Sequence, residues 1–153
     1  MRVAISVDME GISGIVSSKE IAEKGIDYER AQEWITADTN AAIEGALEAG
    51  AQEIVVHDSH GFAYRNILFD KIHPEAQLIA GQPVLLFEAE DLKRSFDAAF
   101  LIGYHTGLGQ EGILSHTYSA KNFIDFKVNG KSVDEVQIAT ALCGYFGIPV
   151  VLI

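Results

Sequence analysis

Acidic and histidine side chains follow the short apolar segments of this sequence, at positions where a folded chain could bring them together. Asp8 comes directly after an apolar run, and Glu10 lies two residues further, so an extended backbone would direct both carboxylates to one side. Further along the chain, the same kind of position is occupied in Asp58-Ser59-His60-Gly61, in Gly103-Tyr104-His105, and by Glu135 at the start of a predicted helix.

Imidazole and carboxylate ligands of this kind suit zinc or a similar divalent ion. Asp8, Glu10 and Glu135 carry three negative charges, which two divalent ions balance better than one. The residues therefore suggest two metal ions about 3.5–4 Å apart, with Asp8 bridging them. The ordinary alternative is an acidic surface loop, although acidic side chains beside Gly11 at a strand end are costly without a counter-ion.

The elements that must position these residues alternate between strands and helices. Apolar runs predict strands at Val3–Asp8, Glu53–Asp58, Gln77–Ala80, Ala98–Tyr104 and Pro149–Ile153. Helical periodicity and end signals predict helices over 27–49, 87–94 and 134–146, and the glycine-containing residues 9–18 read as a loop. Asn129-Gly130 predicts a type I′ turn within a β-hairpin near 121–133.

This order predicts an α/β fold, with a mostly parallel central sheet flanked by helices and an inserted hairpin. Ligands of such sheets bind beyond the carboxyl ends of the strands, where the candidate residues fall.

Composition narrows the class of protein. The 153 residues are 48% hydrophobic, which argues against disorder, and no apolar run approaches the ~20 residues that a bilayer requires. A net charge of −11 without a basic cluster argues against nucleic acid as a partner. Cys143 is a lone cysteine, expected to be buried, and no signal peptide is evident, so we expect a cytoplasmic protein with neither a membrane nor a nucleic-acid partner.

One motif points elsewhere and is rejected. Residues 107–112 match the GxGxxG pattern of dinucleotide-binding folds, which requires a helix to begin there. The residues that follow, 113–118, read as extended instead, and Glu111 would repel phosphate. A flexible loop that brings His116 near the metal site explains these glycines better.

Five short motifs occur in an order that resembles a known family. They are Ser6-Val7-Asp8-Met9-Glu10-Gly11-Ile12-Ser13-Gly14, His57-Asp58-Ser59-His60, Ile72-His73-Pro74-Glu75-Ala76, Gly103-Tyr104-His105 and Leu114-Ser115-His116. Over its whole length the sequence is similar to the N-terminal part of the zinc-dependent D-aminopeptidase (dipeptide-transport protein A) family.

The resemblance implies a function and a site. It implies hydrolysis of N-terminal D-amino acids from short peptides, a link to dipeptide transport, and a ring-like homo-oligomer. It also implies a catalytic His116 and a site for two zinc ions formed by Asp8, Glu10, His60, His105 and Glu135. Residues 1–153 would then form a single α/β metal-binding domain. Because family members continue further, we expect this chain to lack their C-terminal part.

Three neighbouring residues have simpler interpretations. His57 and His73 are expected to be hydrogen-bonded surface residues. Asp58 could either orient a ligand histidine or cap the turn that follows it.

Two other functions are compatible with these residues. A metal-dependent phosphohydrolase would use similar ligands, with Arg65 or Lys121 binding the phosphate. A non-catalytic fragment that binds metal or peptide is the second. His116 could act as the acid–base group or as the nucleophile.

Overall fold

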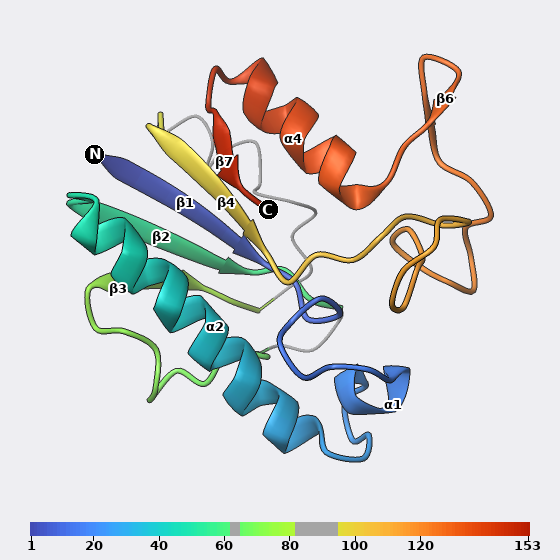
Figure 1. Cartoon of the computed structure of the whole chain (residues 1–153), viewed down its shortest axis with the longest axis horizontal. Coiled ribbons are helices and arrows are strands. Elements are labelled where there is room, and N and C mark those ends of the chain that lie inside the picture. The colour runs from blue at the N-terminus through green and yellow to red at the C-terminus, as the bar shows by residue number, and fades with distance from the viewer. Residues whose placement is uncertain (62–64, 82–94) are drawn as a thin grey trace.

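A five-stranded parallel sheet forms the centre of the protein (Figure 1), seen in a computed structural model in which residues 1–61, 65–81 and 95–153 are described. Its strand order is β3-β2-β1-β4-β7. The strands are β1 (Arg2–Val7), β2 (Glu53–Asp58), β3 (Ala76–Ile79), β4 (Ala98–Ile102) and β7 (Val150–Leu152). The predicted α/β class and parallel sheet are confirmed.

The three central strands end at the same level. Val7, the last residue of β1, lies opposite Asp58 of β2 and Ile102 of β4. The loops that leave β1, β2 and β4 therefore start side by side at one edge of the sheet, and these are the loops that carry most of the candidate ligands.

Two helices cover opposite faces of this sheet. Val3, Ile5 and Val7 pack in the cluster that contains buried residues of α2 (Tyr28–Glu48), whereas Ala4 packs with buried residues of α4 (Glu135–Tyr145). Because successive side chains of a strand point to opposite faces, the two clusters lie on the two sides of the sheet. Cys143, a residue of α4, is fully buried, as expected.

The predicted hairpin is present but short. β5 (Lys127–Val128) pairs antiparallel with β6 (Lys131–Ser132), apart from the main sheet, and the hairpin extends beyond the start of α4 (Figure 1). Asn129 and Gly130 have φ angles of 52° and 77°, and a type I′ turn requires positive φ at both residues.

Several predicted boundaries change. The structure contains a four-residue helix, α1 (Ser18–Ile21), that was not predicted from the sequence. Residues 113–118 are not extended: Leu114 and Tyr118 have φ angles of 52° and 56°, and the chain turns there. Residues 103–126, all of them described, contain no helix, which supports the rejection of the dinucleotide motif. The helix predicted over 87–94 lies outside the described residues.

Two glycines let the loops after β1 and β4 approach each other closely. Gly11 donates its N–H to the Gly103 carbonyl over 2.8 Å, and Asp8 donates its N–H to the Ile102 carbonyl over 2.8 Å. Gly103 has a φ of +70°, and a Cβ there would overlap the main-chain oxygen of Asp8. A side chain at Gly103 would therefore force apart the segments that carry Asp8 and His105.

None of the helices in the described part of the chain has both the length and the apolar composition that a membrane span requires.

Candidate metal centre

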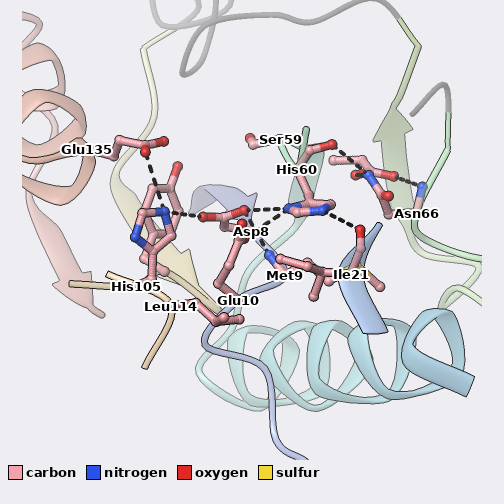
Figure 2. Close-up of polar contacts among 12 residues, drawn as sticks. Asp8, Met9, Glu10, Ile21, Ser59, His60, Asn66, His105, Leu114 and Glu135 are labelled. Atoms are coloured by element: carbon pink, nitrogen blue, oxygen red, sulfur yellow. Dashed lines mark hydrogen bonds and ion pairs between the residues drawn. The ribbon is translucent and has the colours of Figure 1, made fainter. Parts of the chain in front are cut away.

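Six polar side chains from four segments of the chain meet at the carboxyl ends of the central strands, and Figure 2 labels five of them. Four of the six are buried and only 5–9% exposed: Asp8, Glu10, His60 and His105. The six are Asp8, Glu10, His60, His105, His116 and Glu135.

The first group combines the loop after β1 with the loop after β2. His60 Nδ1 lies 3.1 Å from Asp8 Oδ1 and 2.9 Å from Glu10 Oε2. Ligand atoms of these three residues lie within 4.8 Å of one another, which is close enough for them to coordinate one ion.

The second group uses the same aspartate from its other side. His105 Nε2 lies 3.5 Å from Asp8 Oδ2 and 3.3 Å from Glu135 Oε1. Asp8 therefore directs one oxygen toward each group. This is the arrangement that a carboxylate bridging two ions requires.

His116 stands beside both groups. Its ring stacks on that of His105, with centroids 3.9 Å apart and 11° between the planes. Its Nε2 lies 3.7 Å from Glu10 Oε1, and its side chain is 18% exposed, more than those of His60 and His105. The partial exposure leaves His116 the most accessible of the three imidazoles.

Each imidazole is anchored to a main-chain carbonyl. His60 Nε2 lies 3.0 Å from Ile21 O, His105 Nδ1 lies 2.9 Å from Thr106 O, and His116 Nδ1 lies 2.8 Å from Leu114 O. A carbonyl only accepts, so the nitrogen facing it carries the proton. In a neutral imidazole the other nitrogen then presents its lone pair to the carboxylates. A nitrogen lone pair and a carboxylate oxygen repel each other unless a cation or a proton lies between them. Zinc binds both imidazole nitrogen and carboxylate oxygen, so these residues fit zinc.

The charges of the cluster shift its proton affinities. Burial, together with the charge of Glu10, raises the pKa of Asp8 to about 7. Burial also disfavours the Glu10 carboxylate, but hydrogen bonding to His60 outweighs it and lowers the pKa of Glu10 to about 2. Burial lowers the pKa of His105, but Glu135 and Asp8 outweigh it and raise that pKa to about 9. In the same way, Asp8 and Glu10 outweigh burial and raise the pKa of His60 well above 6.5. The site thus favours positive charge at these nitrogens.

The structure distinguishes Asp134 from Glu135, two carboxylates that are adjacent in the sequence. Asp134 is the N-cap of α4, where its side chain accepts the Gln137 N–H over 2.8 Å. Glu135 turns toward His105, and its Oε1 accepts the Tyr118 N–H over 2.6 Å. Helix capping therefore uses one carboxylate and leaves the other for the site.

Three residues outside the cluster take defined structural roles. His57 is 2% exposed with Nδ1 3.0 Å from Ser59 Oγ, so its predicted place on the surface was wrong, because β2 is a central strand. His73 accepts the Glu75 N–H over 3.2 Å, away from the cluster. Asp58 accepts the Asn66 N–H over 2.6 Å, so it caps the loop after β2.

Asn66, whose amide donates to the His60 carbonyl over 2.9 Å, was not predicted as a site residue. The three carbonyls that anchor the imidazoles were not predicted either. Main-chain groups have no signature in a sequence, but Asn66 could have been suspected as a polar residue shortly after Asp58 and His60.

Comparison with known proteins gives consistent matches over the whole chain. The model of the D-aminopeptidase family matches residues 1–153. The D-aminopeptidase of Bacillus subtilis (strain 168) is 32% identical over 155 residues, covering 100% of this chain and 55% of that protein. A solved structure, the Zn-dependent D-aminopeptidase DppA from Bacillus subtilis, a self-compartmentalizing protease, superposes with a TM-score of 0.88. It shares 33% identity over 98% of this chain and 54% of its own. This chain spans about half the length of these relatives.

Proposed function

Because the chain belongs to the D-aminopeptidase family, we propose that it is a zinc-dependent hydrolase that removes N-terminal D-amino acids from short peptides. The observation that carries this proposal is the position of Asp8, which directs one oxygen to each of two donor groups. The preference for D-residues rests on family membership alone.

We propose that the centre takes two zinc ions. Asp8, Glu10 and His60 would hold one, and Asp8, His105 and Glu135 the other. Zinc held there would act as a Lewis acid that polarises the scissile carbonyl and makes water more acidic. The main-chain carbonyls of Ile21 and Thr106 fix the rings of His60 and His105 before any ligand binds.

His116 would act as the acid–base group of the reaction. Its Nδ1 faces the Leu114 carbonyl, so Nε2 is the nitrogen available to accept a proton from the attacking water and return it to the leaving amine. If Nε2 were instead the nucleophile, an acyl group would accumulate on the protein with a slow substrate, and mass spectrometry of the intact chain would detect it.

The test is peptide hydrolysis measured beside zinc content. We expect the wild type to cleave D-alanyl-D-alanine faster than L-alanyl-L-alanine, and His116→Ala to lower kcat by about 10²- to 10⁴-fold with its zinc content unchanged. His73→Ala, which removes an imidazole outside the cluster, serves as the control and should retain activity. Full activity in His116→Ala would contradict the assigned role. Tight dipeptide binding without turnover by the wild type would favour the non-catalytic alternative.

The phosphohydrolase alternative receives no support from the basic residues. In the part of the chain that the structure describes, the ion pairs of lysine and arginine join Arg2 to Glu53, Lys71 to Glu33 and Lys127 to Asp125, all outside the cluster. Arg65 and Lys121 are both exposed. Phosphatase turnover that is lost in Arg65→Ala or Lys121→Ala would revive this alternative.

We propose further that the protein forms a homo-oligomer in the cytoplasm, as the self-compartmentalizing relative suggests. The surface best suited to a second copy is residues 121–133, which include the hairpin. This segment carries three lysines and one aspartate, whereas the rest of the chain carries eight basic and 21 acidic residues, so the segment complements the acidic surface of another copy. It also exposes Ile124, 93% accessible, and Val128, 48% accessible.

A further inference from the structure

Asn66 is a buried amide whose hydrogen-bonding groups are all used. It is 1% exposed. Its Nδ2 donates to Asp58 Oδ1 over 2.7 Å and to the His60 carbonyl over 2.9 Å, and its Oδ1 accepts the Tyr28 hydroxyl over 2.6 Å. The main-chain N–H of Asn66 donates to Asp58 Oδ2 over 2.6 Å.

These partners permit only one orientation of the amide. A carboxylate and a carbonyl both need donors, so they must face the two N–H groups of Nδ2. An inverted amide would place its oxygen against both acceptors. No aspartate could substitute, because its carboxylate would meet Asp58 and the His60 carbonyl without a proton to share.

The contacts connect three segments around one histidine. Asp58 ends β2, Tyr28 begins α2, and the His60 carbonyl belongs to the residue that presents its imidazole to Asp8 and Glu10 (Figure 2). At the far side of that imidazole, the carbonyl of Ile21, the last residue of α1, accepts from Nε2. Asn66 thus holds the main chain of His60, while α1 holds its ring.

From this geometry we infer that Asn66 is a positioning residue for the first of the two metal groups, the one formed by Asp8, Glu10 and His60. The inference rests on the two-zinc centre proposed above. The second group is held by other contacts: Thr106 O anchors His105, and the Tyr118 N–H binds Glu135. Loss of Asn66 should therefore weaken one zinc ion and leave the other in place.

The test compares zinc stoichiometry and affinity in the folded, purified chain. Asn66→Ala and Asn66→Asp should weaken the binding of one zinc ion by about 10- to 100-fold, as loss of a supporting partner does at other metal sites. The second zinc ion should keep its wild-type affinity. Tyr28→Phe, which removes one hydroxyl and keeps the ring, should produce a smaller change in the same direction.

Asn40 offers a matched control. Its side chain also connects α2 to a loop, donating to Lys71 O over 2.9 Å and accepting the His73 N–H over 2.8 Å, away from the metal centre. Elemental analysis after dialysis, together with titration against a chelator of known affinity, should give two ions per chain for Asn40→Ala and wild type, and about one for Asn66→Ala.

The possible results separate cleanly. Two zinc ions of unchanged affinity in folded Asn66→Ala and in Asn66→Asp would overturn the inference, as would equal weakening of both ions. If the alanine variant does not fold, Tyr28→Phe decides, and an unchanged affinity there counts against the inference. Fewer than two ions in the wild type would instead refute the two-zinc centre itself.

Discussion

Three histidines of the cluster share one arrangement, although His60 lies on the loop after β2 and the other two, His105 and His116, lie on the loop after β4. Each places one ring nitrogen against a main-chain carbonyl and the other toward carboxylates. The carbonyls belong to Ile21, Thr106 and Leu114, and they fix both the ring orientation and the tautomer of each imidazole. A metal ion that binds such a site meets ligands already in place, so less side-chain entropy is lost on binding.

Asp8 is the residue on which both metal groups depend. We predict that Asp8→Ala abolishes the binding of both zinc ions, because it removes one oxygen from each group. Glu10→Ala should weaken mainly the ion shared with His60, since Glu10 Oε2 faces that side. Elemental analysis of the dialysed variants gives the stoichiometry. Equal loss of zinc in the two variants would argue against a bridging role for Asp8.

Much of the candidate site could be predicted from the sequence at this scale, because side chains at the ends of parallel strands converge. Asp8, Glu10 and His105 lie within three residues of the ends of β1 and β4, so the rule for parallel sheets alone predicts where they gather. The anchoring carbonyls could not be predicted, since every residue has one. Asn66 acts through a buried contact with His60 that depends on how the loop after β2 folds back.

At the scale of elements, the site depends on how closely two loops approach each other. Gly103, the first residue after β4, has a positive φ, and its carbonyl accepts the Gly11 N–H, so the loops after β1 and β4 are bonded directly. This contact sets the separation between Asp8 and His105.

Gly103→Ala should therefore destabilise the protein. The added Cβ would overlap the Asp8 oxygen, and overpacking of this kind typically costs about 1–3 kcal/mol, with unfavourable φ adding to it. Gly45→Ala, in α2, is the control. A Cβ there meets nothing within 4 Å, so alanine should stabilise the helix by about 0.5–1 kcal/mol. Urea unfolding of both variants measures the difference, and equal effects would contradict the role of Gly103.

An element could be predicted where a pattern over several residues specifies it, and could not be predicted where a few local contacts determine the backbone conformation. The five strands and the long helix α2 follow from apolar patterns that extend over several residues. Helix α1 has only four residues, which is too short for a periodic pattern of apolar residues. A capping box between Ser17 and Glu20 stabilises it instead. In residues 113–118, positive φ angles at Leu114 and Tyr118 override an apparently extended pattern.

At the scale of the whole molecule, the cluster joins parts of the chain that are far apart in sequence. Its ligands come from the loops after β1, β2 and β4 and from the start of α4. Each proposed ion would take ligands from two or more of these segments, which only the folded state brings together, so binding would stabilise that state.

Zinc removal should consequently lower stability. At a free zinc concentration 100 times the Kd, we expect each ion to add about 2.7 kcal/mol to the free energy of unfolding. Thermal unfolding with zinc, with a chelator, and with magnesium in place of zinc checks this. Magnesium should give little protection, because it prefers oxygen ligands over imidazole. An unchanged Tm after zinc is removed would show that the groups do not bind zinc in the folded chain.

Assembly provides a test at the same scale. Ile124→Asp should shift the protein toward the monomer, because it adds a negative charge, which the acidic surface of a second copy repels, to the exposed apolar side of residues 121–133. Ile26→Asp, at a residue 68% exposed in the turn before α2, is the control and should assemble as the wild type does. Sedimentation equilibrium measures both. A wild-type protein that is monomeric at all concentrations, or an Ile124→Asp variant that still assembles fully, would refute this interface.

The position of the ligands along the chain sets an order for metal acquisition during synthesis. Asp8, Glu10 and His60, with Asn66, all leave the ribosome within the first 66 residues, whereas Glu135 emerges 69 residues later. At about 5–20 residues per second, roughly 3 to 14 s separate the two events. In the proposed two-zinc centre, the residues of the first group would therefore be available while β4 and α4 are still being translated, and a zinc ion bound there would hold the β1 and β2 loops together until the second group is complete.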